Sequence, residues 1–307
     1  MSLSKEQIEE FKTIYKKEFG KEISDSEAYE QGTKLVRLLE ILHKENCKHE
    51  FMKKHTIKNR KQLNIVIEVE ETENQKGLVF IVHGLGGFKE QHQMEAMKRA
   101  FLSNGYTVVR YDSSNAFGES GGNLEDATIT QYYHDLENII EWSKLQEWYQ
   151  EPFVLMGHSV GGFCVTLYTI NHPEQIRAVA PISPVVSGEL FSKTKEIQEV
   201  IDEWKKTGIR EWESGTRPGV MKRLKYDFMT DALQYDLLTM VQGIKVPTLL
   251  VVGENDEVTP QEHQKLLYDM LSTEKEFHII DKAGHTFREE PGLTQLENII
   301  SNWIKKT

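Results

Sequence analysis

Residues 152–162 read PFVLMGHSVGG, and this stretch decides the fold. An apolar run, typical of a strand buried on both faces, leads into the pentapeptide GHSVG at 157–161, and a helical stretch over 160–171 follows. A serine on so sharp a strand-to-helix turn is held in a strained backbone conformation that projects its hydroxyl above the sheet. The flanking glycines allow strand and helix to approach closely. We therefore interpret Ser159 as a nucleophile, with a merely tight structural turn as the alternative.

The residues on either side of this stretch alternate between strand and helix patterns. A hairpin is predicted over 51–70, with its turn at 59–62. The further strand-like runs lie at 78–83, 106–112, 177–183, 248–254 and 276–281, and the further helical stretches at 89–103, 129–145, 260–272 and 292–305. Strands that alternate with helices of about 10–15 residues predict an α/β fold with a mainly parallel sheet covered on both faces.

A serine hydroxyl needs a base to take its proton, and His285 is the best of the eleven histidines. It lies in AGHTF, just past the last strand, where open α/β sheets place their catalytic groups. His278 within a strand and His263 within a helix are interpreted as structural. His158 neighbours the nucleophile but is expected to point elsewhere on the turn, so it is kept only as a candidate for substrate binding.

The base needs an acid that fixes its tautomer, and the segment GENDEVTP at 253–260 offers three carboxylates after a strand. Asp256 at the apex of this loop is our choice, while Glu254 and Glu257 are interpreted as solvated charges. Serine, aspartate and histidine then follow in the chain order that this kind of nucleophile turn predicts.

The glycine-rich segment HGLGG at 83–87 follows the first strand of the alternating pattern. An oxyanion hole needs two backbone N–H groups, which we assign to Val160, after the nucleophile, and to Leu85 in this segment. Gly84 is a further candidate for substrate contact. A phosphate-binding loop is the disfavoured alternative, because the segment lacks both G-x-G-x-x-G and the P-loop lysine-serine signature.

With these motifs in place, residues 51–307 resemble serine esterases and lipases of the α/β-hydrolase superfamily, including carboxylesterases, monoglyceride lipases and cinnamoyl esterases. The resemblance rests on HGLGG, GHSVGG, GENDEVTP and AGHTF in the family's order. It implies the α/β-hydrolase fold and hydrolysis of a carboxylic ester with no cofactor and no metal. A serine at the turn argues against dehalogenases and epoxide hydrolases, which carry aspartate there. A thioesterase or amide-cleaving hydrolase would share every motif, and a non-catalytic binding module is the alternative of a different class.

One loop departs from the family's pattern. Residues 112–120 read DSSNAFGES, which is one residue longer than the usual D-x-[R/N]-G-H-G-x-S and replaces Gly-His by Ala-Phe. Because this loop borders the site in such enzymes, Phe117 is a candidate for substrate contact.

The interval 186–235 separates two strands by more than a crossover helix needs, which favours a lid over the site. Its large apolar side chains either pack the lid or line an acyl or aryl pocket, and Trp204 and Trp212 are the candidates for substrate binding. The set comprises Leu190, Phe191, Trp204, Trp212, Phe228 and Met229. No cluster of Arg or Lys lies near the motifs, so an anionic substrate is not expected. A short or medium acyl ester, or an aryl ester, is the expected small-molecule substrate.

Residues 1–45 read as a helical extension before a hydrolase domain of 46–307. Gly20 is expected to close the first helix in the left-handed conformation, and Ser24 with Glu27 fits a capping box that starts the second. The apolar stripes of two short helices need a partner surface. We expect these helices to pack on the main domain, to cover the pocket or lid, or to form a homodimer. The lid is the alternative surface for a homodimer.

Composition sets the remaining expectations. The 307 residues carry a net charge of −11, although residues 1–63 hold 14 Lys/Arg against 11 Asp/Glu. An acidic body repels nucleic acid and anionic membranes, so neither is an expected partner. The two cysteines fit neither a disulfide framework nor a zinc site. Without a signal peptide or apolar span, a cytoplasmic location is expected.

Overall fold

The computed structural model describes residues 5–25, 27–29, 31–32, 34, 52–214, 219–288 and 291–307. The chain divides into two compact units, Met1–Met52 and Lys53–Thr307. Within the described ranges, no helix is both long and apolar enough to cross a membrane.

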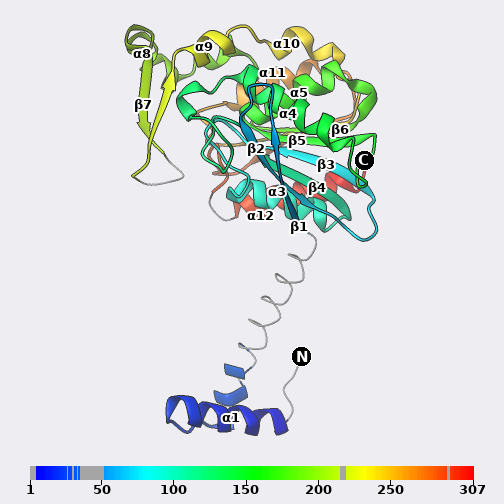
Figure 1. Cartoon of the computed structure of the whole chain (residues 1–307), viewed down its shortest axis with the longest axis vertical. Coiled ribbons are helices and arrows are strands. Elements are labelled where there is room, and N and C mark those ends of the chain that lie inside the picture. The colour runs from blue at the N-terminus through cyan, green and yellow to red at the C-terminus, as the bar shows by residue number, and fades with distance from the viewer. Residues whose placement is uncertain are drawn as a thin grey trace. The chain divides into compact units, whose positions relative to one another are not determined.

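The first unit contains the helix α1, Lys5–Phe19 (Figure 1). Gly20 follows it with φ +67°, the left-handed conformation predicted for this position. The predicted capping box is also present, since the Ser24 N–H donates to Glu27 Oε2 at 2.9 Å and the Glu27 N–H donates to Ser24 Oγ at 3.3 Å. Most of the second predicted helix, with the residues 35–50, lies outside the described residues.

The second unit is built on an eight-stranded sheet in the order β1-β2-β4-β3-β5-β6-β9-β10. From β4 to β10 all neighbours are parallel, whereas β2 runs antiparallel to β4. The strands are β1 (Met52–Lys58), β2 (Asn64–Glu70), β3 (Gly77–Val82), β4 (Tyr106–Asp112), β5 (Phe153–His158), β6 (Ile176–Ile182), β9 (Thr248–Gly253) and β10 (Lys275–Ile280). The predicted hairpin is therefore β1–β2, and all six predicted strands beyond it are present.

Helices cover both faces of this sheet (Figure 1). One face carries α3 (His92–Leu102) and α12 (Gly292–Ile304), which pack against each other. The opposite face carries α4 (Ile129–Ser143), α5 (Val160–Asn171), α10 (Leu237–Met240) and α11 (Gln261–Met270).

The central strand β3 shows why the sheet is buried on both sides. Leu78, Phe80 and Val82 point into the core beneath α4 and α5, and the alternate residues Val79 and Ile81 point into the core beneath α3 and α12. All five are almost completely buried. Because side chains alternate along a strand, this apolar run supplies both cores at once.

We define the lid segment as residues 186–235, the interval singled out in the sequence. It contains α6 (Gly188–Ser192), α7 (Lys195–Gln198), α8 (Ile201–Thr207), β7 (Ile209–Glu213), β8 (Met221–Lys225) and α9 (Asp227–Ala232). The strands β7 and β8 pair antiparallel in a small separate sheet that projects at one end of this unit (Figure 1).

Candidate active site

Ser159 sits at the turn between β5 and α5 in a strained conformation, with φ 57° and ψ −119°. A positive φ is costly for a residue with a side chain, so the surrounding packing must hold it. The Ser159 N–H donates to the Ile182 carbonyl at 3.0 Å. A Cβ on Gly157 would lie 2.3 Å from the Gly161 carbonyl oxygen, and one on Gly161 would lie 2.3 Å from the Val82 oxygen. The turn therefore has room only for glycine at both positions.

The Asp256 carboxylate and the His285 ring lie in direct contact past the ends of β9 and β10. His285 Nδ1 is 2.9 Å from Asp256 Oδ2 and 3.1 Å from Oδ1. Asp256 also accepts hydrogen bonds from the Val258 and Thr259 N–H groups at 3.0 and 2.8 Å. Because a carboxylate can only accept a hydrogen bond, Nδ1 of His285 must carry the proton that it donates to Asp256. Nε2 is then the basic nitrogen of the ring.

Thr259 is a member of this group that sequence reasoning missed. Its hydroxyl lies 3.0 Å from Asp256 Oδ2, 3.2 Å from His285 Nδ1 and 3.0 Å from the Ser183 carbonyl oxygen. Burial alone would raise the pKa of Asp256, but the charge and hydrogen bonds of His285, together with the Thr259 N–H, hold it below its usual value. The Asp256 carboxylate is therefore ionised at neutral pH.

His158 contributes to the site in a way that the sequence did not predict. Its Nε2 lies 2.7 Å from the His285 carbonyl oxygen, and the two rings are 4.6 Å apart between centroids. The expectation that His158 would point away from the reacting groups is therefore wrong. Burial, and next the charge of His285, lower the pKa of His158 to about 3. It is thus a neutral ring that donates from Nε2 and fixes the loop carrying His285.

The two predicted oxyanion donors flank the nucleophile. Val160 is the first residue of α5, and the first N–H groups of a helix have no intrahelical partner. Leu85 lies in the loop after β3 and lines the same cavity as Ser159. A Cβ on Gly84 would lie 3.0 Å from Ser159 Cβ, so the backbone of this loop runs directly against the nucleophile.

Two buried side chains hold this loop in place. His83 Nε2 accepts from the Ser113 N–H at 2.9 Å, so its Nδ1 carries the proton and donates to the Gly84 oxygen at 2.8 Å. Burial lowers the pKa of His83 and keeps it neutral. The Tyr132 hydroxyl accepts from the Gly86 N–H at 3.2 Å. The conformation of the predicted oxyanion loop is thus fixed from both sides.

Ser159 and His285 open into one cavity of about 440 Å³ beneath the lid segment. Four of the five predicted substrate contacts line it, namely Gly84, His158, Trp204 and Trp212. The apolar remainder of the lining includes Val160, Val185, Phe191, Ile197, Leu224 and Phe228. Phe117 is not among the lining residues. The centre of its ring lies 5.6 Å from Nζ of Lys222, which does line the cavity.

The charges of the cavity contradict the expectation drawn from the motifs. Arg210, Lys222 and Arg288 line it, together with Glu196 and Glu213. Four of these residues belong to the lid segment, which the fold brings over the site although it is distant from the motifs in sequence. Arg288, in contrast, directly follows the AGHTF motif. The Arg210 guanidinium pairs with Glu196 at 2.6 Å and stacks over Trp212 at 4.7 Å.

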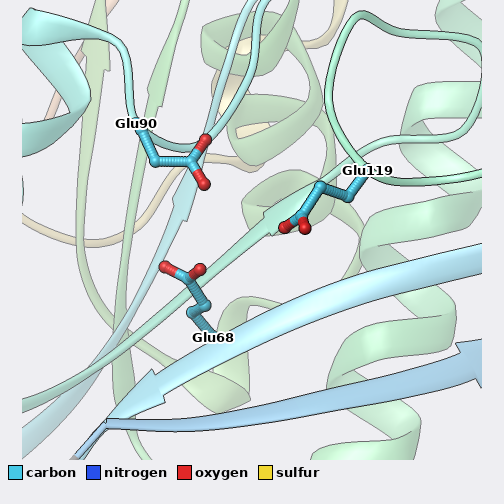
Figure 2. Close-up of side chains that lie close together, drawn as sticks. All are labelled: Glu68, Glu90 and Glu119. Carbon is cyan, nitrogen blue, oxygen red and sulfur yellow. The ribbon is translucent and has the colours of Figure 1, made fainter.

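A group of carboxylates with metal-site spacing lies elsewhere in this unit. Among the described residues, Glu68, Glu90 and Glu119 have oxygens within 4.8 Å of one another, and Figure 2 shows them pointing toward a common centre. Lys89 Nζ lies 3.6, 2.6 and 2.7 Å from these three carboxylates and 2.9 Å from Asp112. Burial opposes the charge of Lys89, but hydrogen bonds to these carboxylates raise its pKa. The chain's own ammonium therefore serves as the cation of this cluster.

Comparison with known proteins covers the part of the chain that contains Ser159, Asp256 and His285. A family model described as serine aminopeptidase, S33, matches residues 73–292. The palmitoyl-protein thioesterase ABHD10, mitochondrial, of Bos taurus is 24% identical over 234 residues, which cover 75% of this chain and 73% of that protein.

Two solved structures resemble the second unit. Est1E from Butyrivibrio proteoclasticus with bound ferulic acid gives a TM-score of 0.69 at 19% identity, covering 82% of this chain and 98% of that one. The mouse alpha/beta hydrolase domain-containing protein 10 gives 0.67 at 21% identity, covering 83% and 99%. At these identities the likeness concerns the fold.

Proposed function

Since the chain belongs to the serine aminopeptidase S33 family of α/β-hydrolases, we propose that it hydrolyses carboxylic esters of short or medium acyl groups, or aryl esters, through an acyl-enzyme on Ser159. Membership of this family confirms the fold and the superfamily expected from the motifs, and it makes the chain a serine-type hydrolase. The bond cleaved, the three catalytic residues and the pocket are what we propose beyond it.

The proposal depends on one arrangement. A serine in a strained turn and a histidine with its Nδ1 bonded to a buried aspartate open into the same cavity, beside a glycine-rich loop. Nucleophile, base, orienting acid and backbone donors are the four parts that acyl transfer requires. A ligand-binding protein would need neither the strain at Ser159 nor the bonded pair.

In the proposed reaction, Ser159 Oγ attacks the ester carbonyl as His285 Nε2 takes its proton. The N–H groups of Leu85 and Val160 hold the oxyanion, at about 3–4 kcal/mol for each donor. Asp256 stabilises the imidazolium that forms. His285 then protonates the leaving alcohol, and a water activated by the same nitrogen hydrolyses the acyl-enzyme.

The lid segment supports the choice of acyl group. Phe191, Trp204, Leu224 and Phe228 turn apolar surface toward the cavity. A volume of about 440 Å³ lies in the ordinary range for a small-molecule site, roughly 300–1,000 Å³. The apolar part of its walls favours a compact acyl or aryl group.

A panel of p-nitrophenyl esters from acetate to decanoate tests the proposal. Wild type should hydrolyse the shorter members, and Ser159→Ala should lower kcat by at least about 10³-fold. Ser103→Ala is the matched control, because this serine caps α3 and does not line the cavity. A fluorophosphonate that modifies wild type should leave Ser159→Ala unlabelled. Equal turnover by wild type and Ser159→Ala would refute the mechanism.

Thioester hydrolysis is the second candidate, and the relatives named palmitoyl-protein thioesterase favour it. The same residues would act, with a thiolate as the leaving group. Thioesters of the acyl chains in the ester panel, followed with a thiol reagent, separate the two readings. Turnover of thioesters with no turnover of any ester would replace the first proposal by the second.

We also propose that the enzyme acts in the cytoplasm without stable membrane association. The thioesterase relatives are described as mitochondrial, so the two compartments are the alternatives to compare. Imaging of the full chain with a fluorescent tag at its C-terminus, followed by fractionation, distinguishes them.

A further inference from the structure

Lys222 reaches from the lid strand β8 to the loop that we assign to the oxyanion. The side chain is half-buried and lines the cavity. Its Nζ lies 5.6 Å from the centre of the Phe117 ring and 5.8 Å from that of Trp212. It also lies 3.4 Å from the position that a Cβ on Gly86 would take. The ammonium therefore lies next to Gly86, the residue that follows the proposed donor Leu85 in the chain.

Lys222 differs from the other cations of the lid hairpin. Arg210 pairs with Glu196 at 2.6 Å, Arg223 with Glu211 at 2.8 Å, and Lys225 with Asp126. In the part of the chain that the structure describes, no carboxylate or carbonyl pairs with Lys222 Nζ. Its neighbours are aromatic faces, which favour a cation but leave its hydrogen-bond donors unused.

This position is costly for a charge in the absence of a ligand. Burial, and next the charge of Arg288, lower the pKa of Lys222, while Glu196 acts in the opposite direction. An anion that entered the cavity would restore hydrogen bonds and reduce the repulsion between the two cations. Amine donors to a carboxylate or phosphate are among the stronger hydrogen bonds in proteins.

We propose that Lys222 determines specificity by binding an anionic group, a carboxylate or a phosphate, carried on the substrate. The inference rests on the proposed function and narrows its substrate to esters or thioesters with a charge near the scissile carbonyl. Lys222 stands beside the oxyanion loop, and both the acyl part and the leaving part of an ester adjoin the scissile carbonyl. The two sources to compare are therefore a carboxylate on the acyl part and a phosphate on the leaving part.

Two pairs of substrates separate these sources. In the acyl pair, p-nitrophenyl hydrogen glutarate carries a carboxylate and p-nitrophenyl pentanoate has a similar length without it. In the leaving-group pair, acetyl-coenzyme A carries phosphates and S-acetyl-N-acetylcysteamine does not. The measured quantity is the ratio of kcat/KM, anionic over neutral, within each pair.

Lys222→Met should lower this ratio by about ten- to hundredfold in one pair, with the change mainly in KM. Lys222→Arg should keep most of the preference. Lys206→Met is the matched control, since it removes the same charge from an exposed position of α8 in the lid segment. It should leave both ratios unchanged, and turnover of the neutral esters shows that each variant is folded.

A ratio that is the same in wild type and Lys222→Met for both pairs would overturn the proposal. Binding provides a readout that does not depend on hydrolysis. In the Ser159→Ala protein, glutarate or coenzyme A should bind, detected by calorimetry, and adding Lys222→Met should weaken that binding by about tenfold or more. A wild type that cleaves no ester or thioester would end the proposed function, and this binding result would then decide the inference alone.

Discussion

Acid should destabilise the native protein through His158, and replacing this residue by glutamine should remove that part of the pH dependence. His158 is 3% exposed and its pKa is lowered to about 3 by burial and by the charge of His285. In the unfolded chain the same ring titrates near pH 6.5. Between these two values the unfolded state binds a proton that the native state does not, so the free energy of unfolding falls as the pH decreases.

The size of the effect follows from the distance of the pH from 6.5. A pH of 5 lies about 1.5 units below 6.5, and each unit corresponds to about 1.4 kcal/mol. Protonation of the ring therefore lowers the free energy of the unfolded state by about 2 kcal/mol, while the native ring is still neutral. At pH 7.5 the contribution is close to zero. The figure at pH 5 changes little for any native pKa below about 4, because the native state then takes up almost no proton.

Urea unfolding at pH 7.5 and pH 5.0 measures this effect in wild type and in His158→Gln. At pH 7.5 the variant should be less stable by about 1–2 kcal/mol, since it loses packing and weakens the bond to the His285 carbonyl. At pH 5.0 this deficit should shrink by about 2 kcal/mol. The titrations of His83 and Asp256 are common to both proteins and cancel in the difference. A deficit that is equal at both pH values would refute the reasoning.

Three further substitutions test other parts of the site. Asp256→Asn should lower kcat on p-nitrophenyl esters by about 10⁴-fold, because an amide cannot hold the His285 tautomer, and an unchanged rate would remove Asp256 from the triad. Tyr132→Phe should lower kcat several-fold with little change in KM, because the Gly86 N–H loses its acceptor and the oxyanion loop loosens; a change in KM alone would contradict this role. Trp204→Phe should cost about 1–3 kcal/mol in urea unfolding, since the indole N–H bonds a buried carbonyl of β8 at 2.9 Å, and a variant as stable as wild type would show that this bond contributes nothing.

The sequence was most informative where a local pattern carries the structure. Apolar runs of strand length placed β3, β5 and β9, and the turn GHSVG placed Ser159 between a strand and a helix. The contact between Asp256 and His285 was predictable for a different reason. Both residues follow parallel strands, and the carboxyl ends of parallel strands meet at one edge of the sheet.

Other features could not be predicted because they depend on packing between distant segments. Lys222 and Arg210 reach the cavity only through the register of β7 with β8, which pairs Trp212 with Lys222. Sequence spacing shows nothing of how that hairpin sits over the site. The contact between Thr259 and Asp256 was within reach of a sequence prediction, since Thr259 lies three residues after Asp256 and an aspartate side chain often bonds the backbone or a side chain at that distance.

The same arrangement gives a reason for a charged substrate. His83 and His158 are held neutral by burial, so His285 is the histidine of this group that takes up the proton in the proposed reaction. The imidazolium then shares one cavity with the cation of Lys222, and like charges in a poorly solvated site repel. An anion on the substrate would offset the Lys222 charge before the imidazolium forms. Lys222→Met should therefore raise kcat on neutral esters modestly while lowering kcat/KM on anionic ones, and a loss of kcat on neutral esters would instead make Lys222 part of the oxyanion support.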